Sequence, residues 1–261
     1  MNSLLLLLLA ATAQPGAEFE ERAFVYSGGP YQNEEFKYRL LKPKTIEDGK
    51  TYPVVLFLHG AGERGTDNKR QLKYFPDQMS KTPWREKYPC FLVAPQCRPG
   101  KQWVDVPWGD KKSTPLRDHP THQMKVAIGI LEEVIQKNPA DSTRVYLTGL
   151  SMGGYGSWDL AARRPDWFAA VAPICGGGDE RQAAKLKDVP LWAFHGGADR
   201  VVPTVRSRQM IEALRAAGGK PKYDEFPGVG HNSWSRAYQN PEGCVPWMFQ
   251  QTNAAAKPKN K

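Results

Sequence analysis

The sequence predicts an α/β fold, in which a mostly parallel, doubly wound sheet is covered by helices on both faces to give three layers. Short continuous apolar runs recur along the chain, as expected for strands that are buried on both sides of a parallel sheet. Helical stretches with one apolar face alternate with these runs, which implies right-handed β-α-β crossovers. The apolar runs are 54–58, 91–94, 145–147, 169–171 and 191–194.

The N-terminal end of the sheet is expected to be antiparallel. Apolar and basic residues alternate from Phe36 to Leu40, which is typical of a half-buried strand, and residues 23–27 are its candidate partner. Apolar periodicity, prolines and glycines predict the remaining elements. These are helices at 126–135, at 151–164 and from Pro203 to Gly218, a last strand at 222–226, and a closing helical region between 233 and 250.

Two long segments, 62–87 and 96–120, fit this scheme poorly. Both are rich in Gly, Pro and Trp, and both follow the end of a predicted strand. Ligands of open α/β sheets bind at the carboxyl ends of the strands. We therefore expect these segments to be loops that wall a substrate cleft.

The folded domain is predicted to span 14–253. Residues 1–13 resemble a signal peptide, because Leu4–Leu9 is an apolar run too short to cross a bilayer and Ala11–Ala13 is a small-x-small cleavage pattern. Lys and Arg are absent from this segment, so an uncleaved anchor is the alternative. The sequence favours a secreted or periplasmic protein without stable membrane insertion after cleavage. Residues 254–261 form a basic, solvated tail.

The charge distribution argues against nucleic-acid binding, and the cysteine and histidine spacing argues against a metal site. The formal charge of +9 is attributed to solubility, because no arginine-rich helix or basic-aromatic strand indicates nucleic acid. No metal site is predicted, since no Cys-x-x-Cys occurs and His119 and His122 read as surface or loop residues. Disulfide pairing and buried free thiols are equally compatible with four cysteines. These are Cys90, Cys97, Cys175 and Cys244.

The strongest chemical signal is Gly149-Leu150-Ser151-Met152-Gly153, a G-x-S-x-G motif between a predicted strand and a predicted helix. A nucleophilic serine must be exposed on a tight turn, and the flanking glycines let strand and helix approach each other closely there. In this context the motif predicts that Ser151 is a nucleophile rather than an ordinary turn serine.

A serine nucleophile needs a base, and two histidines follow Ser151 in the sequence. His231 lies in a Gly-rich loop after the last predicted strand, where an imidazole can reach the serine. His195 ends an apolar strand and reads as a packed residue. We therefore predict that His231 is the base.

The acid that orients the base is expected between the serine and the histidine in sequence. Asp199 follows a buried strand directly and is preferred, whereas Asp179, which follows Gly176-Gly177-Gly178, is the rival. Asp188 and Asp224 are less well placed. Capping of the next helix is the structural alternative for Asp199 and for Asp179.

An oxyanion hole requires two N–H donors, each of which contributes on the order of 3 kcal/mol to transition-state stabilisation. The N–H of Met152, directly after the nucleophile, is one candidate. The other is the N–H of Ala61, with Gly62 second, in the loop after the first parallel strand. His59 in the same loop is expected to brace it.

These motifs resemble a bacterial family of the α/β-hydrolase superfamily, described as predicted peptidases, phospholipase/carboxylesterase-like proteins and polyhydroxybutyrate-depolymerase-like esterases. The resemblance extends from about Phe36 to Phe249. It implies a Ser-Asp-His esterase, matching Ser151, Asp199 and His231, without a metal or an organic cofactor. It is carried by the runs 58–68, 94–96, 103–108 and 149–154.

The leading functional hypothesis is a secreted carboxylesterase that hydrolyses short-chain acyl or aryl esters, including feruloyl or acetyl esters linked to polysaccharide. Trp103 and Trp108 could offer a flat sugar or aryl platform, and loop packing is the equal alternative for both. A serine peptidase of prolyl-oligopeptidase type and a non-catalytic carbohydrate-binding module are the competing hypotheses. A lipase is disfavoured, because the candidate cap segments are too charged for a broad apolar lid.

Overall fold

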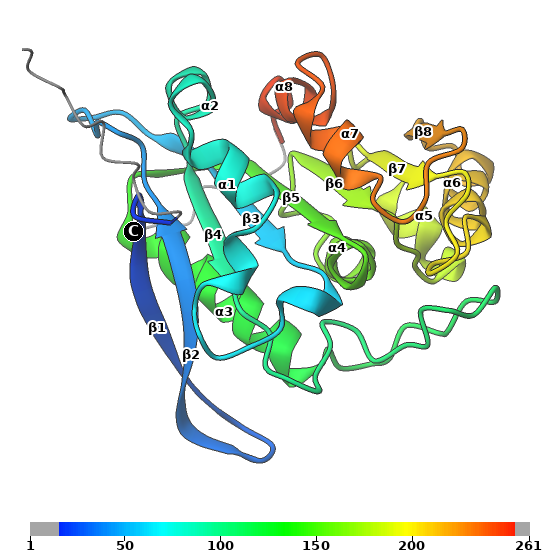
Figure 1. Cartoon of the computed structure of the whole chain (residues 1–261), viewed down its shortest axis with the longest axis horizontal. Coiled ribbons are helices and arrows are strands. Elements are labelled where there is room, and N and C mark those ends of the chain that lie inside the picture. The colour runs from blue at the N-terminus through cyan, green and yellow to red at the C-terminus, as the bar shows by residue number, and fades with distance from the viewer. Residues whose placement is uncertain (1–15, 254–261) are drawn as a thin grey trace, which may run out of the picture.

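The computed structural model describes residues 16–253, and in this range eight strands form one sheet in the order β1-β2-β4-β3-β5-β6-β7-β8 (Figure 1). β1 pairs antiparallel with β2 and β2 with β4, whereas every other neighbouring pair is parallel. The predicted fold class is therefore confirmed. The strands are β1 (Phe19–Gly28), β2 (Tyr31–Leu41), β3 (Tyr52–Leu58), β4 (Phe91–Pro95), β5 (Ala140–Leu150), β6 (Ala170–Ile174), β7 (Trp192–Gly196) and β8 (Lys222–Phe226).

Helices cover both faces of the sheet and form two separate apolar layers. In β3, Val54, Leu56 and Leu58 face one layer, while Val55 and Phe57 face the other, so the whole strand is buried. This explains why its sequence is a continuous apolar run. The first layer contains α3 (His122–Lys137), α4 (Met152–Arg163), α5 (Ala183–Leu186) and α6 (Val205–Ala216). The second contains α1 (Phe75–Ser80), α2 (Thr82–Lys87), α7 (Trp234–Gln239) and α8 (Cys244–Phe249).

The segment 62–87 is not the long loop that the sequence suggested. It connects β3 to β4 through two 3-10 turns, Ala61–Glu63 and Arg70–Leu72, and through α1 and α2. Both helices carry a proline in the first turn, where its missing N–H costs no hydrogen bond. They are six residues long, too short for the repeated apolar stripe by which helices are recognised in sequence.

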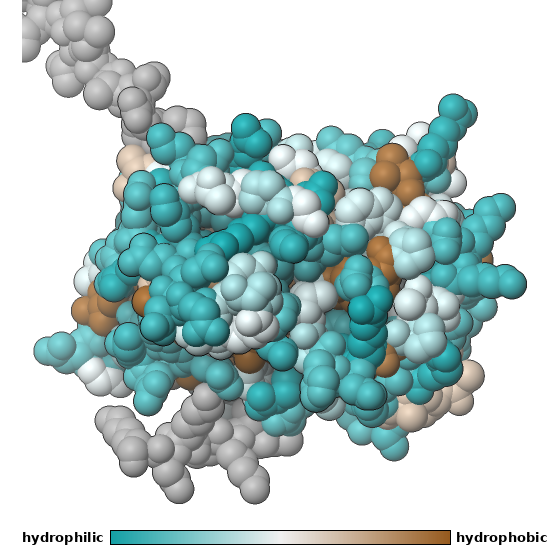
Figure 2. Space-filling model, turned by 90° about the horizontal axis from the view of Figure 1, so that it is seen from below, coloured by the Kyte–Doolittle hydropathy of each residue, from teal (hydrophilic) through white to brown (hydrophobic). Residues whose placement is uncertain are grey.

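The segment 96–120 is irregular, as expected, and connects β4 to α3. It follows the lower edge of the molecule in Figure 1, beneath α4. Several hydrogen bonds hold it to the layer of α4, two of them from Arg163 in α4 to the Arg117 and Asp118 carbonyls. The Leu116 N–H donates to Asp179 Oδ2 at 2.8 Å, and the Tyr155 hydroxyl donates to the Trp108 carbonyl at 3.0 Å. Seen from this edge, the surface is mainly hydrophilic and its apolar residues form small separate patches (Figure 2).

The four cysteines are buried free thiols. Of the two alternatives that the sequence left open, disulfide pairing and free thiols, the structure therefore has free thiols. Between residues 16 and 253, no helix is both long enough and apolar enough to cross a membrane. The predicted signal peptide at 1–13 and the basic tail at 254–261 lie outside the described residues.

His59 joins the loop after β3 to the loop after β4. Its Nε2 accepts a hydrogen bond from the Cys97 N–H at 2.9 Å, and its Nδ1 lies 2.7 Å from the Gly60 carbonyl oxygen, to which it donates. Because a backbone N–H can only donate, Nε2 carries no proton and the ring is neutral. The ring is 1% exposed, and this burial lowers its pKa to about 4. The structure therefore agrees with a bracing role for His59.

This geometry predicts a loss of stability in acid. Between pH 6.5 and pH 4 the unfolded chain protonates His59 while the folded chain does not, so stability falls as the pH falls through this window. We expect the unfolding free energy of the wild type to drop by about 2 kcal/mol more than that of His59→Gln when the pH is lowered from 7.5 to 5. Urea unfolding of both proteins at both pH values measures this difference. An identical pH dependence would contradict the prediction.

Candidate active site

Ser151 occupies the sharp turn between β5 and α4, with φ 55° and ψ −116°. A residue with a side chain adopts this conformation only at a cost of about 1–3 kcal/mol. Two glycines make the turn possible. A Cβ on Gly153 would lie 1.8 Å from the Leu58 carbonyl oxygen, and one on Gly149 would lie 2.4 Å from the Gly153 carbonyl oxygen. The strand-turn-helix context predicted for the motif is therefore present.

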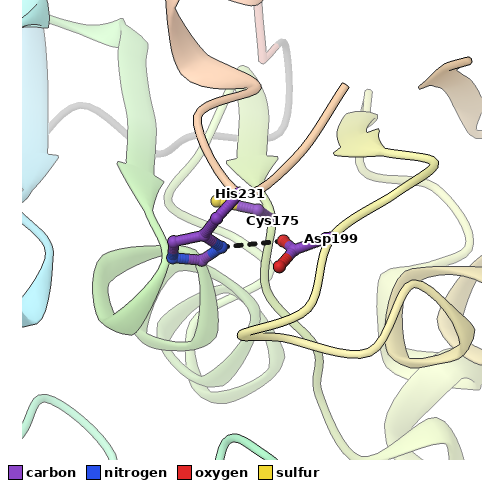
Figure 3. Close-up of side chains that lie close together, drawn as sticks. All are labelled: Cys175, Asp199 and His231. Carbon is purple, nitrogen blue, oxygen red and sulfur yellow. Dashed lines mark hydrogen bonds and ion pairs between the residues drawn. The ribbon is translucent and has the colours of Figure 1, made fainter. Parts of the chain in front are cut away.

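Loops after three different strands bring Ser151, Asp199 and His231 together. Ser151 follows β5, Asp199 follows β7, and His231 follows β8. The Ser151 hydroxyl lies 2.9 Å from His231 Nε2. His231 Nδ1 lies 2.7 Å from Asp199 Oδ2 (Figure 3). With Nδ1 protonated, the imidazole donates to the carboxylate and accepts from the hydroxyl. In this arrangement a serine can transfer its proton to a base whose tautomer is fixed.

The environment of Asp199 favours its ionised form. Its side chain is fully buried, and burial alone would raise the pKa of the carboxyl group. Hydrogen bonds from His195 and His231 and from the N–H groups of Val201 and Val202 outweigh burial and hold this pKa well below its usual value. The carboxylate is therefore charged at neutral pH and can stabilise a protonated imidazole.

His195 is the packed residue that the sequence suggested, but it also contacts the acid. It is fully buried, and its Nδ1 lies 2.7 Å from the Ser207 hydroxyl. Its Nε2 lies 3.1 Å from the Val202 carbonyl oxygen and 3.3 Å from Asp199 Oδ2. His195 and His231 therefore contact the same carboxylate oxygen of Asp199. Its position at the end of β7, four residues before Asp199, was the available sequence signal for this contact.

Asp179, the rival acid, lies elsewhere in the structure. Its carboxylate accepts from the N–H groups of Leu116 and Arg181, and it forms an ion pair with Arg181. These bonds cap a short 3-10 helix at 180–182 and anchor the segment 96–120. The capping alternative therefore describes Asp179.

Cys175 is a neighbour of the triad that sequence reasoning did not identify. It directly follows β6 with φ 40°, and its thiol lies beside Asp199 and His231 (Figure 3). One ligand atom from each of the three side chains falls within 4.8 Å of the others, close enough to hold a metal ion. However, burial raises the pKa of the Cys175 thiol, and the histidine and the aspartate are hydrogen-bonded to each other. This chemistry favours a neutral thiol packed against the triad over a metal ligand.

The loop that carries Ala61 lies against the serine turn. A Cβ on Gly60 would lie 2.7 Å from the Leu150 side chain, and one on Gly153 would lie 2.9 Å from the His59 carbonyl oxygen. Ala61 starts a 3-10 turn at the end of β3, and Met152 is the first residue of α4. N–H groups in the first turn of a helix have no intrahelical partner, so both are suitable for donating to an oxyanion.

The structure separates the two predicted substrate-binding tryptophans. Trp103 is 1% exposed, and its indole N–H donates to the His59 carbonyl at 3.0 Å. It therefore packs beneath the loop and offers no open platform, so loop packing is the correct interpretation for Trp103. Trp108 is half-buried in the segment 96–120, and its carbonyl is held by Tyr155.

Comparison with known proteins supports an esterase. A "Probable inactive carboxylesterase" of Oryza sativa subsp. japonica is 25% identical over 207 residues, which cover 74% of this chain and 82% of the relative. A solved thermostable esterase is 36% identical with a TM-score of 0.81, covering 91% of this chain and 64% of that one. A solved ferulic acid esterase has a TM-score of 0.60 at 20% identity, covering 88% of this chain and 97% of that one, and this likeness shows the fold alone.

Some relatives are matched only in part, since the chain spans 35% to 38% of the length of several bacterial ones. The model of the dienelactone hydrolase family matches residues 111–260, more than half of the chain. This match includes the serine turn and the loops that carry Asp199 and His231. Together with the esterase relatives, it places the chain among the carboxylic ester hydrolases. The chain belongs to the dienelactone hydrolase family, within the α/β-hydrolase superfamily.

Proposed function

We propose that this protein is a secreted serine carboxylesterase that hydrolyses short-chain acyl or aryl esters, including acetyl or feruloyl groups on polysaccharide, through Ser151, His231 and Asp199. The observation that carries the proposal is the pair of hydrogen bonds, 2.9 Å and 2.7 Å long, that joins these three side chains. The family match and the esterase relatives support the reaction class. The likeness in fold to a ferulic acid esterase motivates the choice of aryl esters.

In the proposed mechanism, the Ser151 oxygen attacks the ester carbonyl carbon while its proton passes to His231 Nε2. The carbonyl oxygen becomes an oxyanion that accepts hydrogen bonds from the N–H groups of Met152 and Ala61. The intermediate collapses by breaking the bond to the alcohol oxygen, which takes the proton from His231. Water, deprotonated by His231, then cleaves the acyl-serine and releases the acid. Asp199 stays ionised throughout and stabilises the imidazolium.

Ser151→Ala should abolish ester hydrolysis without unfolding the protein. Alanine removes the nucleophile and keeps the turn, so we expect a loss of at least about 10⁴-fold in kcat for 4-nitrophenyl acetate. The wild type should be labelled by a fluorophosphonate probe and the variant should not. A wild type that is neither labelled nor active would favour a non-catalytic binding module. Cleavage of peptides but not of esters would favour a peptidase.

Two aspartate variants test the assignment of the acid. Asp199→Asn removes the charge that holds the His231 tautomer, and we expect kcat to fall by about 10³- to 10⁴-fold. Asp179→Asn is the matched control and should change kcat less than about tenfold, because Asp179 acts only as a loop anchor. Steady-state kinetics with 4-nitrophenyl butyrate distinguish the two. A larger loss in the Asp179 variant would reverse the assignment.

Export is tested by the chemistry of the mature N-terminus. Because residues 11–13 form the small-x-small pattern, we expect the secreted form to begin at Gln14. N-terminal sequencing of protein recovered from the medium or the periplasm of the expressing cells checks this. Recovery of the intact chain only from the membrane fraction would support the uncleaved anchor instead.

A further inference from the structure

A groove of about 320 Å³ lies between α1 and α2 on one side and α7 on the other. Four aromatic side chains line it, Tyr74, Trp84, Trp234 and Tyr238. Polar side chains interleave with them, among them Asp77, Lys81, Ser235 and Gln239. A volume near 300 Å³ is within the range of small-ligand sites, and mixed aromatic and polar walls are typical of them.

One residue of the groove wall, Trp234, contacts the catalytic base. The Trp234 ring stands edge-on to the His231 imidazole, with centroids 5.4 Å apart and an interplanar angle of 89°. Tyr74 packs against the same Trp234 at 5.3 Å. The groove and His231 therefore share one aromatic side chain, Trp234, which links the groove to the base side of the triad.

The mechanism determines which half of an ester lies on that side. The alcohol oxygen takes its proton from His231 as it leaves, so the alcohol must depart towards the imidazole. The groove is thus positioned for the alcohol part of the substrate rather than for the acyl part.

The composition of the groove indicates the chemistry of that alcohol. Aromatic faces can cover the C–H surface of a sugar ring, while hydroxyl, amide and carboxylate groups can pair with its hydroxyls. Asp77 and Lys81 form an ion pair of 2.8 Å within the groove. Because the two charges neutralise each other, the groove does not favour a charged ligand. We propose, on the basis of the esterase function proposed above, that this groove binds a neutral pyranose ring of the alcohol.

Tyr74 provides a second, independent observation. Its backbone has φ 65° and ψ −108°, close to the values at Ser151, although Tyr74 is neither glycine nor buried in the core. Its side chain is among the exposed large hydrophobic ones, with 39% of its surface accessible. Strain of this kind persists where the position of the side chain is useful. Placing a ring at the mouth of the groove is such a use.

The test keeps the acyl group constant and changes only the alcohol. Trp84→Ala should lower kcat/KM for mono-acetylated methyl β-xylopyranoside by about tenfold more than for ethyl acetate, the size expected when one aromatic contact is lost. Trp167→Ala, a partly buried tryptophan outside the groove, is the matched control and should affect both esters equally. Equal losses for both esters in Trp84→Ala would overturn the proposal.

Tyr74→Gly separates this role from a structural one. Glycine adopts the Tyr74 conformation without strain, so the melting temperature should not fall by more than about 2 °C, while the preference for the sugar ester decreases as it does in Trp84→Ala. A large loss of stability with unchanged preference would assign Tyr74 to the fold alone and would count against the groove.

Binding measured without turnover distinguishes failure of this inference from failure of the proposed function. Calorimetric titration of Ser151→Ala with methyl β-xylopyranoside should show saturable binding that the additional Trp84→Ala substitution abolishes. If the wild type hydrolyses neither ester but this binding is present, the proposed function fails and the groove stands. If both esters are hydrolysed and the glycoside does not bind, the groove assignment fails and the esterase stands.

Discussion

The contact between the end of β3 and the start of α4 sets the geometry on which the site depends. At Gly153 the helix lies so close to the Leu58 carbonyl that no Cβ can be accommodated. The chain must therefore turn sharply between β5 and α4, and Ser151 takes the left-handed conformation that results. The central strands, which are buried on both faces, supply the stability that offsets this strain. The same contact brings the loop with Ala61 beside the first turn of α4, so that one close approach positions both the hydroxyl and the candidate oxyanion donors.

The buried carboxylate of Asp199 is the second feature on which the site depends. The Asp199 side chain is fully buried and remains ionised, yet within residues 16–253 its ion-pair partners are His195 and His231, not a Lys or an Arg. Hydrogen bonds from backbone N–H groups and imidazoles stabilise the carboxylate without a permanent positive charge beside it. A fixed cation would compete with the imidazolium for the carboxylate. In the proposed mechanism, this arrangement keeps the negative charge available when His231 takes a proton.

The segment 96–120 and the groove that contains Trp234 are built in different ways. The segment 96–120 has no regular structure and is fixed by individual hydrogen bonds, such as those to Leu116 and Trp108, and by the buried ring of Trp103. The groove between α1, α2 and α7 is lined by aromatic rings, one of which, Trp234, contacts His231. In the proposed function, two such dissimilar regions would serve the two unlike halves of an ester.

The sequence by itself determined where the three proposed catalytic residues lie along the chain: Ser151 between glycines, Asp199 after β7 and His231 after β8. These could be read because buried strands leave continuous apolar runs and because a strained turn requires glycine at fixed spacing. The preference for Asp199 over Asp179 also came from position relative to a strand.

Only the tertiary structure decided what depends on contacts between distant segments. Trp103 is buried because its indole N–H donates to the His59 carbonyl. The segment 62–87 contains two helices of six residues, which are too short to leave an apolar repeat in the sequence. Tyr74 and Trp84 line the same groove as Trp234, which lies about 150 residues further along the chain. No local sequence pattern predicts this, because only the packing of helices on a common sheet face brings such distant side chains together.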